Sequence, residues 1–306
     1  MIRTSPKPLH RLRIPLIKPD RLRGGKPLAR RTERTVDRSR MTLAIGMACP
    51  TGFVFAADTR LAFEDGSVSD MSKMSVFDAG QGQFAIVQSS YDANAGNSLM
   101  HEVATKIQAA NGIDVQDAIK EAMQLWYLPV HENRPVVQLL VGAHFTGSRD
   151  MYFCEPPHTV SPVTASYMAI GGGRVVTDPI YSHWFAKWYP RLPHACLCRI
   201  SYLMHKAKQL YPAHVGGHTD AAFISAFSDF PYFIQRRSMA DAETIAAELD
   251  HYLAGIACCA MSATSQPDAS YFAQQSMQGF ARFEFCCEFP PNDTIDRDFD
   301  FHITTT

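Results

Sequence analysis

The stretch that decides the fold runs from residue 41 to residue 60 and reads MTLAIGMACPTGFVFAADTR. It holds two short apolar segments, 43–48 and 53–57, which are joined by the tetrapeptide Cys-Pro-Thr-Gly at 49–52. Proline and glycine are the strongest turn-forming residues, and two short apolar runs joined by a turn are typical of a β-hairpin. We therefore expect the ordered part of the chain to begin with a hairpin.

The rest of the chain alternates between strand and helix patterns. A second hairpin is expected at 74–77 and 84–87, around the turn at 78–82. Further strands are predicted at 136–141, 150–154, 165–170, 221–227, 232–235 and 280–289, and helices at 94–110, 115–125, 175–189, 200–210 and 240–256. Asp114 is expected to cap the helix at 115–125. Strand blocks that alternate with helix pairs predict an α+β fold with two stacked sheets covered by helices on both sides.

Charge divides the chain into two parts. Residues 1–40 hold 13 Lys and Arg and 3 Asp and Glu, a balance of +10. The totals of 29 basic and 30 acidic residues then leave 16 and 27 for 41–306, a balance of −11. Five prolines and few apolar residues predict that 1–40 is a disordered basic extension. It is either a propeptide, a targeting segment or a nucleic-acid arm, or sequence upstream of a true start at Met41; 41–306 is expected to be a single domain.

Several classes of protein are excluded by composition. No run reaches the roughly 18 apolar residues of a membrane helix, and no signal-peptide pattern is present, so a cytoplasmic protein without membrane contact is expected. The eight cysteines include no Cys-x-x-Cys pair, which predicts reduced thiols rather than a zinc site. His214 and His218 are four residues apart but flank two glycines, and with His205 they make a poor ligand set. We expect neither a metal nor a cofactor.

Three polar residues near the first two hairpins suggest chemistry. Thr42 follows Met41, Asp58 follows the second apolar run, and Lys73 precedes the next strand. Removal of Met41 would give Thr42 a free α-amino group, which can act as the base for its own hydroxyl because its pKa lies near 8. A lysine ammonium would lower that pKa and stabilise a developing alkoxide, and an aspartate would hold the lysine in place.

These residues also carry a family resemblance. Thr42-Leu-Ala-Ile-Gly46, Gly52-Phe-Val-Phe-Ala-Ala-Asp58-Thr-Arg60 and Lys73 resemble the opening of proteasome β-type subunits and their bacterial relatives. Leu139-Leu-Val-Gly142 and Ala169-Ile-Gly-Gly-Gly173 are similar to later strands of that family. The resemblance covers roughly 41–256. It implies the four-layer αββα sandwich of the N-terminal nucleophile hydrolases, with Thr42 as nucleophile, Lys73 as the group that tunes it and Asp58 as the orienting carboxylate. Arg60 is expected to be structural.

The sequence also departs from the family pattern. The family often has a serine where this chain has Gly172, and an Asp and a Ser near the segment 211–217, which holds neither at the matching places. The resemblance therefore leaves two functions open. One is a threonine-type peptidase or amidohydrolase that cleaves peptides or proteins inside a homo-oligomeric ring, and the other is an inactive assembly subunit. Gly171–Gly173 is expected to form a tight turn rather than a phosphate-binding loop. Nucleic-acid binding depends on the extension 1–40 alone, and no unfoldase partner can be named.

Overall fold

The computed structural model describes residues 42–62, 67–90, 92–111, 113–128, 135–146, 148–187, 189–227 and 231–262, the last helix without its side chains after 251. All of these residues belong to one compact unit. The predicted extension 1–40 and the predicted strand 280–289 lie outside the described residues.

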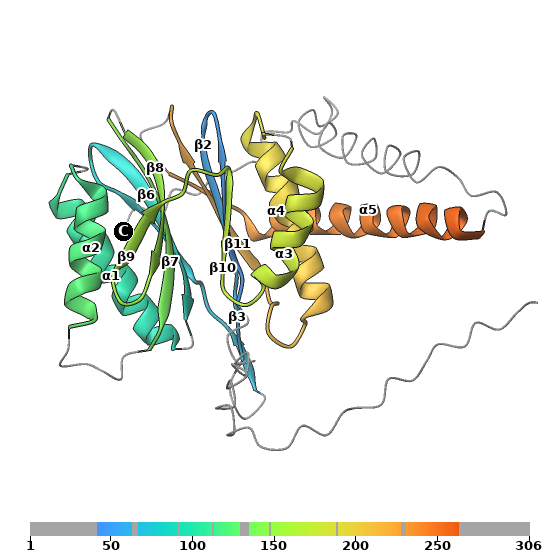
Figure 1. The fold of residues 1–306 in the computed structure, drawn as a ribbon, viewed down its shortest axis with the longest axis horizontal. Helices are drawn as coiled ribbons and strands as arrows, with labels where there is room; N and C mark the ends of the chain where they lie inside the picture. Colours follow the sequence, from blue (N-terminus) through green and yellow to red (C-terminus); the bar gives the residue numbers. More distant parts are fainter. Residues whose placement is uncertain are drawn as a thin grey trace, which may run out of the picture. The chain divides into compact units, whose positions relative to one another are not determined.

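The first five-stranded sheet contains the predicted opening hairpin. Its strands follow the order β10 (Tyr167–Ile170), β1 (Ala44–Cys49), β2 (Gly52–Asp58), β11 (Thr219–Ser225) and β12 (Tyr232–Ile234), and all neighbours are antiparallel (Figure 1). Cys49 pairs with Gly52 across the turn, so the hairpin is confirmed. Its register places Ala44 opposite Ala57, which brings the start of β1 beside the end of β2.

A second five-stranded antiparallel sheet follows the order β5 (Met74–Asp78), β6 (Gly82–Ser90), β7 (Val137–Phe145), β8 (Ser148–Glu155) and β9 (Thr159–Pro162). The short strands β3 (Arg60–Ala62) and β4 (Val68–Asp70) pair with each other. The sequence did not predict β3, β4 or β9. All three contain only three or four residues, most of them exposed or half-buried, so their apolar pattern is too short to be recognised.

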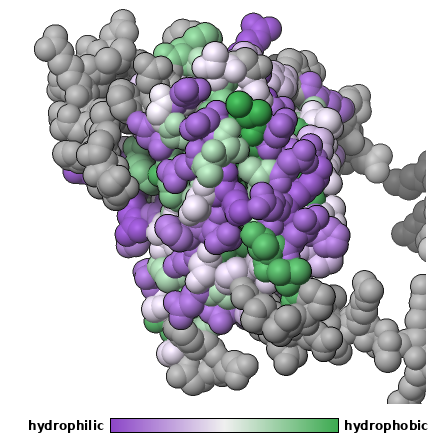
Figure 2. All heavy atoms as spheres, turned by 90° about the vertical axis from the view of Figure 1, so that its left-hand side faces the viewer, coloured by the Kyte–Doolittle hydropathy of each residue, from purple (hydrophilic) through white to green (hydrophobic). Residues whose placement is uncertain are grey.

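The helices pack on the sheets in two groups. Helices α1 (Ala93–Ala109) and α2 (Val115–Trp126) share an apolar cluster with the second sheet. Helix α4 (Pro193–Leu210) packs on the first sheet together with residues of α5 (Arg236–Ser262). Helix α3 (Arg174–Ile180) continues into a π-helical turn at Tyr181–Phe185. The outward face of the molecule on the side of α1 and α2 is mostly hydrophilic, with separate small apolar groups (Figure 2).

A third apolar cluster joins the two sheets to each other. It includes Phe53 and Phe55 of β2, Val87 of β6 and Leu140 of β7. Phe55 fits between the sheets because its neighbours lack side chains: a Cβ on Gly142 would lie 2.3 Å from its ring, and one on Gly46 2.7 Å from it. The fold is therefore mixed α and β, with two antiparallel sheets that bury a common face.

Two local predictions are corrected. Asp114 lies at the N-cap of α2, but its backbone is left-handed (φ 50°) and its side chain makes no capping hydrogen bond. The cysteine prediction holds for Cys49, Cys154 and Cys196, which are buried thiols outside any disulfide, and is wrong for Cys198, which is disulfide-bonded. Pairing depends on proximity in the fold, which the spacing of cysteines along the sequence does not reveal.

Candidate active site

The two hairpins bring the three predicted site residues together. Thr42 lies two residues before β1, Asp58 is the last residue of β2, and Lys73 lies directly before β5. Antiparallel pairing of β1 with β2 sets Thr42 beside Asp58, and Lys73 approaches from the second sheet. All three are buried, with 7%, 0% and 3% of their surface exposed. Polar groups buried to this extent need hydrogen-bond partners, and here they are one another's partners.

The three side chains form a closed set of hydrogen bonds. The Thr42 hydroxyl donates to Asp58 Oδ1 over 2.7 Å. Lys73 Nζ donates to Thr42 Oγ1 over 2.5 Å and to Asp58 Oδ1 over 3.0 Å. The hydroxyl oxygen is thus in contact with a cation on one side and a carboxylate on the other. A positive charge at this distance favours a negative charge that develops on the oxygen.

The Lys73 ammonium has a third acceptor in the Arg60 carbonyl oxygen, 2.6 Å away. An ammonium has three hydrogens to donate, so its capacity is filled. Burial lowers the pKa of Lys73 from its ordinary value of 10.5, and the charge of Asp58 opposes this effect only in part. The lysine is therefore fixed in position and holds its proton less firmly than a lysine in water.

The Asp58 carboxylate is held by main-chain donors as well. Oδ1 accepts from Leu43 N over 2.9 Å, and Oδ2 accepts from Gly216 N over 3.3 Å. Gly216 belongs to the segment 211–217, where the supporting Asp and Ser of the family pattern are missing. The main chain of that segment thus contacts the site. Sequence reasoning missed this donor because every residue except proline carries one.

Arg60 holds the same segment in place. Its guanidinium donates to the Pro212 carbonyl oxygen, and its own amide donates to the Gly216 carbonyl oxygen over 3.2 Å. Gly216 leaves room for this arrangement, because a Cβ there would lie 2.5 Å from the guanidinium carbon. Arg60 therefore has the structural position that the sequence predicts for it.

The glycine run at 171–173 borders the main chain of Thr42. Gly173 N donates to the Thr42 carbonyl oxygen over 3.1 Å. Gly171 has a φ of +87°, and a Cβ there would lie 2.2 Å from the Thr42 carbonyl oxygen and 2.9 Å from Ser89 Oγ. Only glycine fits this position. The run is a turn between β10 and α3, as predicted, and Ser89 is a polar neighbour that sequence reasoning did not single out.

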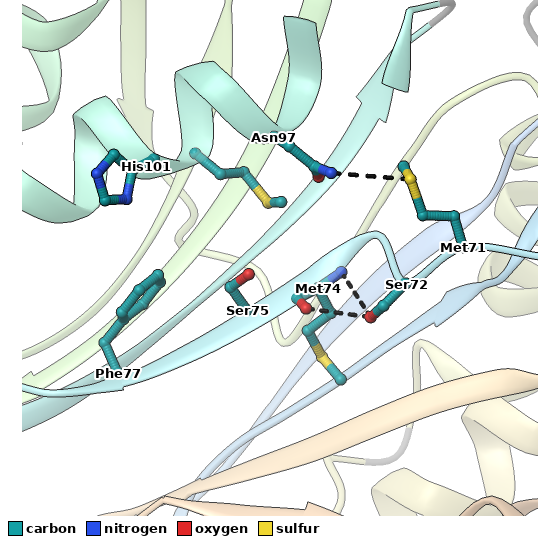
Figure 3. Close-up of a pocket in the computed structure, with 8 residues that line it drawn as sticks. Met71, Ser72, Met74, Ser75, Phe77, Asn97 and His101 are labelled. Carbon is teal, nitrogen blue, oxygen red and sulfur yellow. Dashed lines mark hydrogen bonds between the residues drawn. The ribbon is translucent and has the colours of Figure 1, made fainter. Parts of the chain in front are cut away.

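A cavity of about 450 Å³ lies beside the segment that carries Lys73 (Figure 3). It opens between β5, the edge strand of the second sheet, and α1. It is lined by Met71, Ser72, Met74, Ser75, Phe77, Asn97, Met100 and His101. The Asn97 amide contacts the Met71 sulfur at 3.7 Å. Three methionines and a phenylalanine thus share its lining with two serines, an asparagine and a histidine.

The described residues hold no group of three or more His, Cys, Asp or Glu that could bind a metal ion. His205 lies on α4, with Nε2 4.0 Å from Asp250 Oδ2. His214 and His218 lie in the connection between α4 and β11. The expectation of no metal and no cofactor stays a prediction. None of the described helices is long and apolar enough to cross a membrane.

Comparison with solved structures shows which proteins have a similar fold. The Anbu protein of Yersinia bercovieri, described as an ancestral β-subunit, superimposes with a TM-score of 0.58 over 73% of this chain and 98% of its own. This chain has the Anbu fold. Its sequence is 14% identical to that protein, and identity this low establishes a shared fold but no shared activity.

Two further Anbu structures give the same result. A Gly-1 mutant from Hyphomicrobium sp. strain MC1 has a TM-score of 0.56 and 13% identity, and covers 69% of this chain and 97% of its own. Anbu from Pseudomonas aeruginosa, solved as a helical assembly, has a TM-score of 0.54 and 16% identity, and covers 75% and 100%. No protein-family model matches the sequence, and comparison with curated proteins gives no match. The Anbu neighbours support the predicted proteasome-like family at the level of fold.

Proposed function

We propose that this protein is a threonine-type peptidase or amidohydrolase with Thr42 as its nucleophile. The observation that carries the proposal is the buried contact of the Thr42 hydroxyl with both Lys73 Nζ and Asp58 Oδ1. An isolated threonine on a strand end has no need of a buried ion pair. A hydroxyl that must become a nucleophile needs a base, a counter-charge and a group that orients the counter-charge.

The mechanism begins with a chain that starts at Thr42. The Thr42 hydroxyl turns its hydrogen from Asp58 Oδ1 to the free α-amino group. The amino group takes this proton while Oγ1 attacks the carbonyl carbon of an amide bond. Lys73 stabilises the negative charge that develops, and Asp58 holds Lys73 in place. Transfer of the proton to the departing amine leaves an ester between Thr42 and the acyl part of the substrate. Water then attacks the ester while the α-amino group takes a proton from it. The bond to Thr42 Oγ1 breaks, the amino group returns the proton to Oγ1, and the carboxylic acid is released.

The proposal includes architecture and assembly. We infer that the two sheets and their covering helices form the four-layer αββα sandwich of the N-terminal nucleophile hydrolases. We also propose that copies of this chain assemble with each other, as the Anbu protein of Pseudomonas aeruginosa does in its helical assembly. A head-to-tail contact between identical chains closes into a ring or continues as an open helix, according to the rotation at each contact. Sedimentation that finds only monomer over a wide concentration range would count against assembly.

The cavity beside Lys73 suggests the substrate class. We propose that it receives an apolar, flexible substrate side chain, because three methionines and Phe77 line it (Figure 3). Ser75 lies centrally among the lining residues in Figure 3. The variant Ser75→Leu should therefore reduce kcat/KM about ten-fold or more for substrates with a large apolar side chain, since one methylene in an apolar pocket corresponds to about 1–3 kcal/mol. Turnover of a substrate with alanine at the same position serves as the internal control.

The deciding experiment combines intact mass with covalent labelling. Purified protein is tested for a first residue of Thr42, and for reaction with a threonine-directed epoxyketone in wild type, Thr42→Ala and Thr42→Ser. Labelled wild type, unlabelled Thr42→Ala and weakly labelled Thr42→Ser are expected. Equal labelling of Thr42→Ala would show that the nucleophile lies elsewhere.

A second function is favoured by one observation. Gly172 occupies the position where the family often has a supporting serine, which fits a subunit that assembles without catalysis. A wild-type protein that begins at Thr42, assembles, resists the label and cleaves no member of a broad peptide library would support this alternative.

A further inference from the structure

Ser89, near the end of β6 (Gly82–Ser90), is a polar residue that faces the first sheet. Side chains alternate along β6, so residues two apart share a face. Ala85 and Val87 belong to the cluster between the sheets, whereas Phe84 and Ile86 belong to the cluster against α1. Ser89 therefore continues the row of Ala85 and Val87 and faces the first sheet. It is the next member of that row after two apolar residues, and it is polar.

The hydroxyl of Ser89 lies at the main chain of the candidate nucleophile. The point where a Cβ of Gly171 would stand is 2.9 Å from Ser89 Oγ and 2.2 Å from the Thr42 carbonyl oxygen. The sum of these distances, about 5 Å, is the upper limit for the separation of the two oxygens. Ser89 as a residue is only 8% exposed. Thr42 and Ser89 thus share one small buried space on either side of a glycine.

Other polar groups around Thr42 already have partners. The Thr42 carbonyl oxygen accepts from Gly173 N. Both Asp58 oxygens accept hydrogen bonds, and the three hydrogens of Lys73 have three acceptors. Within the described part of the chain, the Ser89 hydroxyl has no hydrogen-bond partner. The lone pairs of the Ser89 hydroxyl are therefore available to a further donor.

We propose that Ser89 is a positioning residue for Thr42, and that its hydroxyl accepts a hydrogen bond from the free α-amino group of Thr42. The inference rests on the proposed function, since that amino group exists only after Met41 is removed. An amine that serves as a base must keep its lone pair directed at Oγ1. An acceptor that holds one of its N–H groups fixes rotation about the Cα–N bond. Gly172 has no hydroxyl that could accept this hydrogen bond, and Ser89 of β6 provides one.

The test compares Ser89→Ala with Ser90→Ala in the full protein. Ser90 is adjacent but faces the other way, and its hydroxyl donates to the Asp92 carbonyl oxygen over 2.8 Å. Ser89→Ala should reduce the rate of epoxyketone labelling about ten- to a hundred-fold, because misplacement of a reacting group has this effect. Its melting temperature should stay within about 2 °C of wild type. Ser90→Ala should label within about two-fold of wild type.

A second measurement reports the pKa of the Thr42 α-amino group. The rate at which a small acylating reagent modifies the Thr42 α-amino group is followed against pH by mass spectrometry. An acceptor stabilises the ammonium form, so loss of Ser89 should lower the pKa of the amino group and move the midpoint to lower pH. A purely structural role would not move it.

The outcomes separate the two claims. Wild type that is labelled at Thr42, with Ser89→Ala equal to it in rate and midpoint, overturns the role of Ser89 and leaves the proposed function intact. Wild type that begins at Thr42 but is never labelled overturns the nucleophile. In that case an unshifted midpoint in Ser89→Ala overturns the positioning contact as well, and a shifted midpoint retains it.

Discussion

Lys73 Nζ lies 3.0 Å from Asp58 Oδ1, and the two side chains are only 4% and 0% exposed. A buried ion pair is a weak source of stability, but removal of one partner leaves an uncompensated charge in the interior. We therefore expect Lys73→Met and Asp58→Asn each to lower the free energy of unfolding by about 3 kcal/mol. The double variant should lose roughly 1–3 kcal/mol less free energy of unfolding than the two single variants lose together. Urea denaturation of the four proteins measures this, and strict additivity would argue against a coupled pair.

The lowered pKa of Lys73 gives a pH dependence with a defined sign. Between the folded pKa and the unfolded value of 10.5, the unfolded chain binds more protons than the folded one. The contribution of Lys73 to stability therefore increases as pH rises through this window. The stability of wild type relative to Lys73→Met should accordingly improve above neutral pH. If the free energies of unfolding of wild type and Lys73→Met differ by a constant amount from pH 7 to pH 10, the lowered pKa of Lys73 is contradicted.

The pH dependence of activity should also depend on the ionisation of Lys73. Activity should rise with pH as the α-amino group of Thr42 loses its proton, and fall again as Lys73 loses its own below 10.5. Lys73→Arg provides the control, because a guanidinium stays charged throughout this range. Any residual activity of that variant should lack the alkaline decline. If activity falls at alkaline pH in Lys73→Arg as it does in wild type, the fall is caused by a group other than Lys73.

Part of this site could be predicted from the sequence. The turn at 49–52 and the apolar runs around it fixed the first hairpin, and with it the neighbourhood of Thr42 and Asp58. Lys73 was predicted through its place before the next strand. These signals are local, because they depend on turn chemistry and on alternation along one strand.

The rest depends on contacts that leave no local pattern. Gly216 N meets Asp58 across 158 positions of sequence, and Ser89 meets Gly171 only because two sheets stack. A main-chain donor is the same in every residue type except proline, so no sequence pattern identifies it. The polar residue that ends the apolar row of β6 was the one signal that could have pointed to Ser89.

Two aspartates at helix starts also differ in a way that the sequence does not reveal, and they allow a matched test. Asp92 accepts hydrogen bonds from Asn94 N and Ala95 N and caps α1, whereas Asp114 before α2 makes no such bond. Asp92→Ala should lower the free energy of unfolding by about 1 kcal/mol. Asp114→Gly should raise it by up to about 1 kcal/mol, because glycine adopts the left-handed backbone without strain. Thermal unfolding measures both, and a loss of stability in Asp114→Gly would mean that its side chain has a role in the fold.

Gly171 gives the sharpest test of the geometry around Thr42. It shares a positive φ with Gly80, at +87° and +73°, but the two differ in surroundings. A Cβ on Gly80 would meet nothing within 4 Å, whereas one on Gly171 would lie 2.2 Å from the Thr42 carbonyl oxygen. Gly80→Ala should therefore cost only the backbone strain of about 1–2 kcal/mol. Gly171→Ala should cost more, because the main chain of Thr42 must move. That displacement should also abolish epoxyketone labelling, while Gly80→Ala keeps it. If Gly171→Ala unfolds no more easily than Gly80→Ala and still reacts with the label, the close approach of Gly171 to Thr42 is wrong, and the positioning role of Ser89 loses its geometric basis.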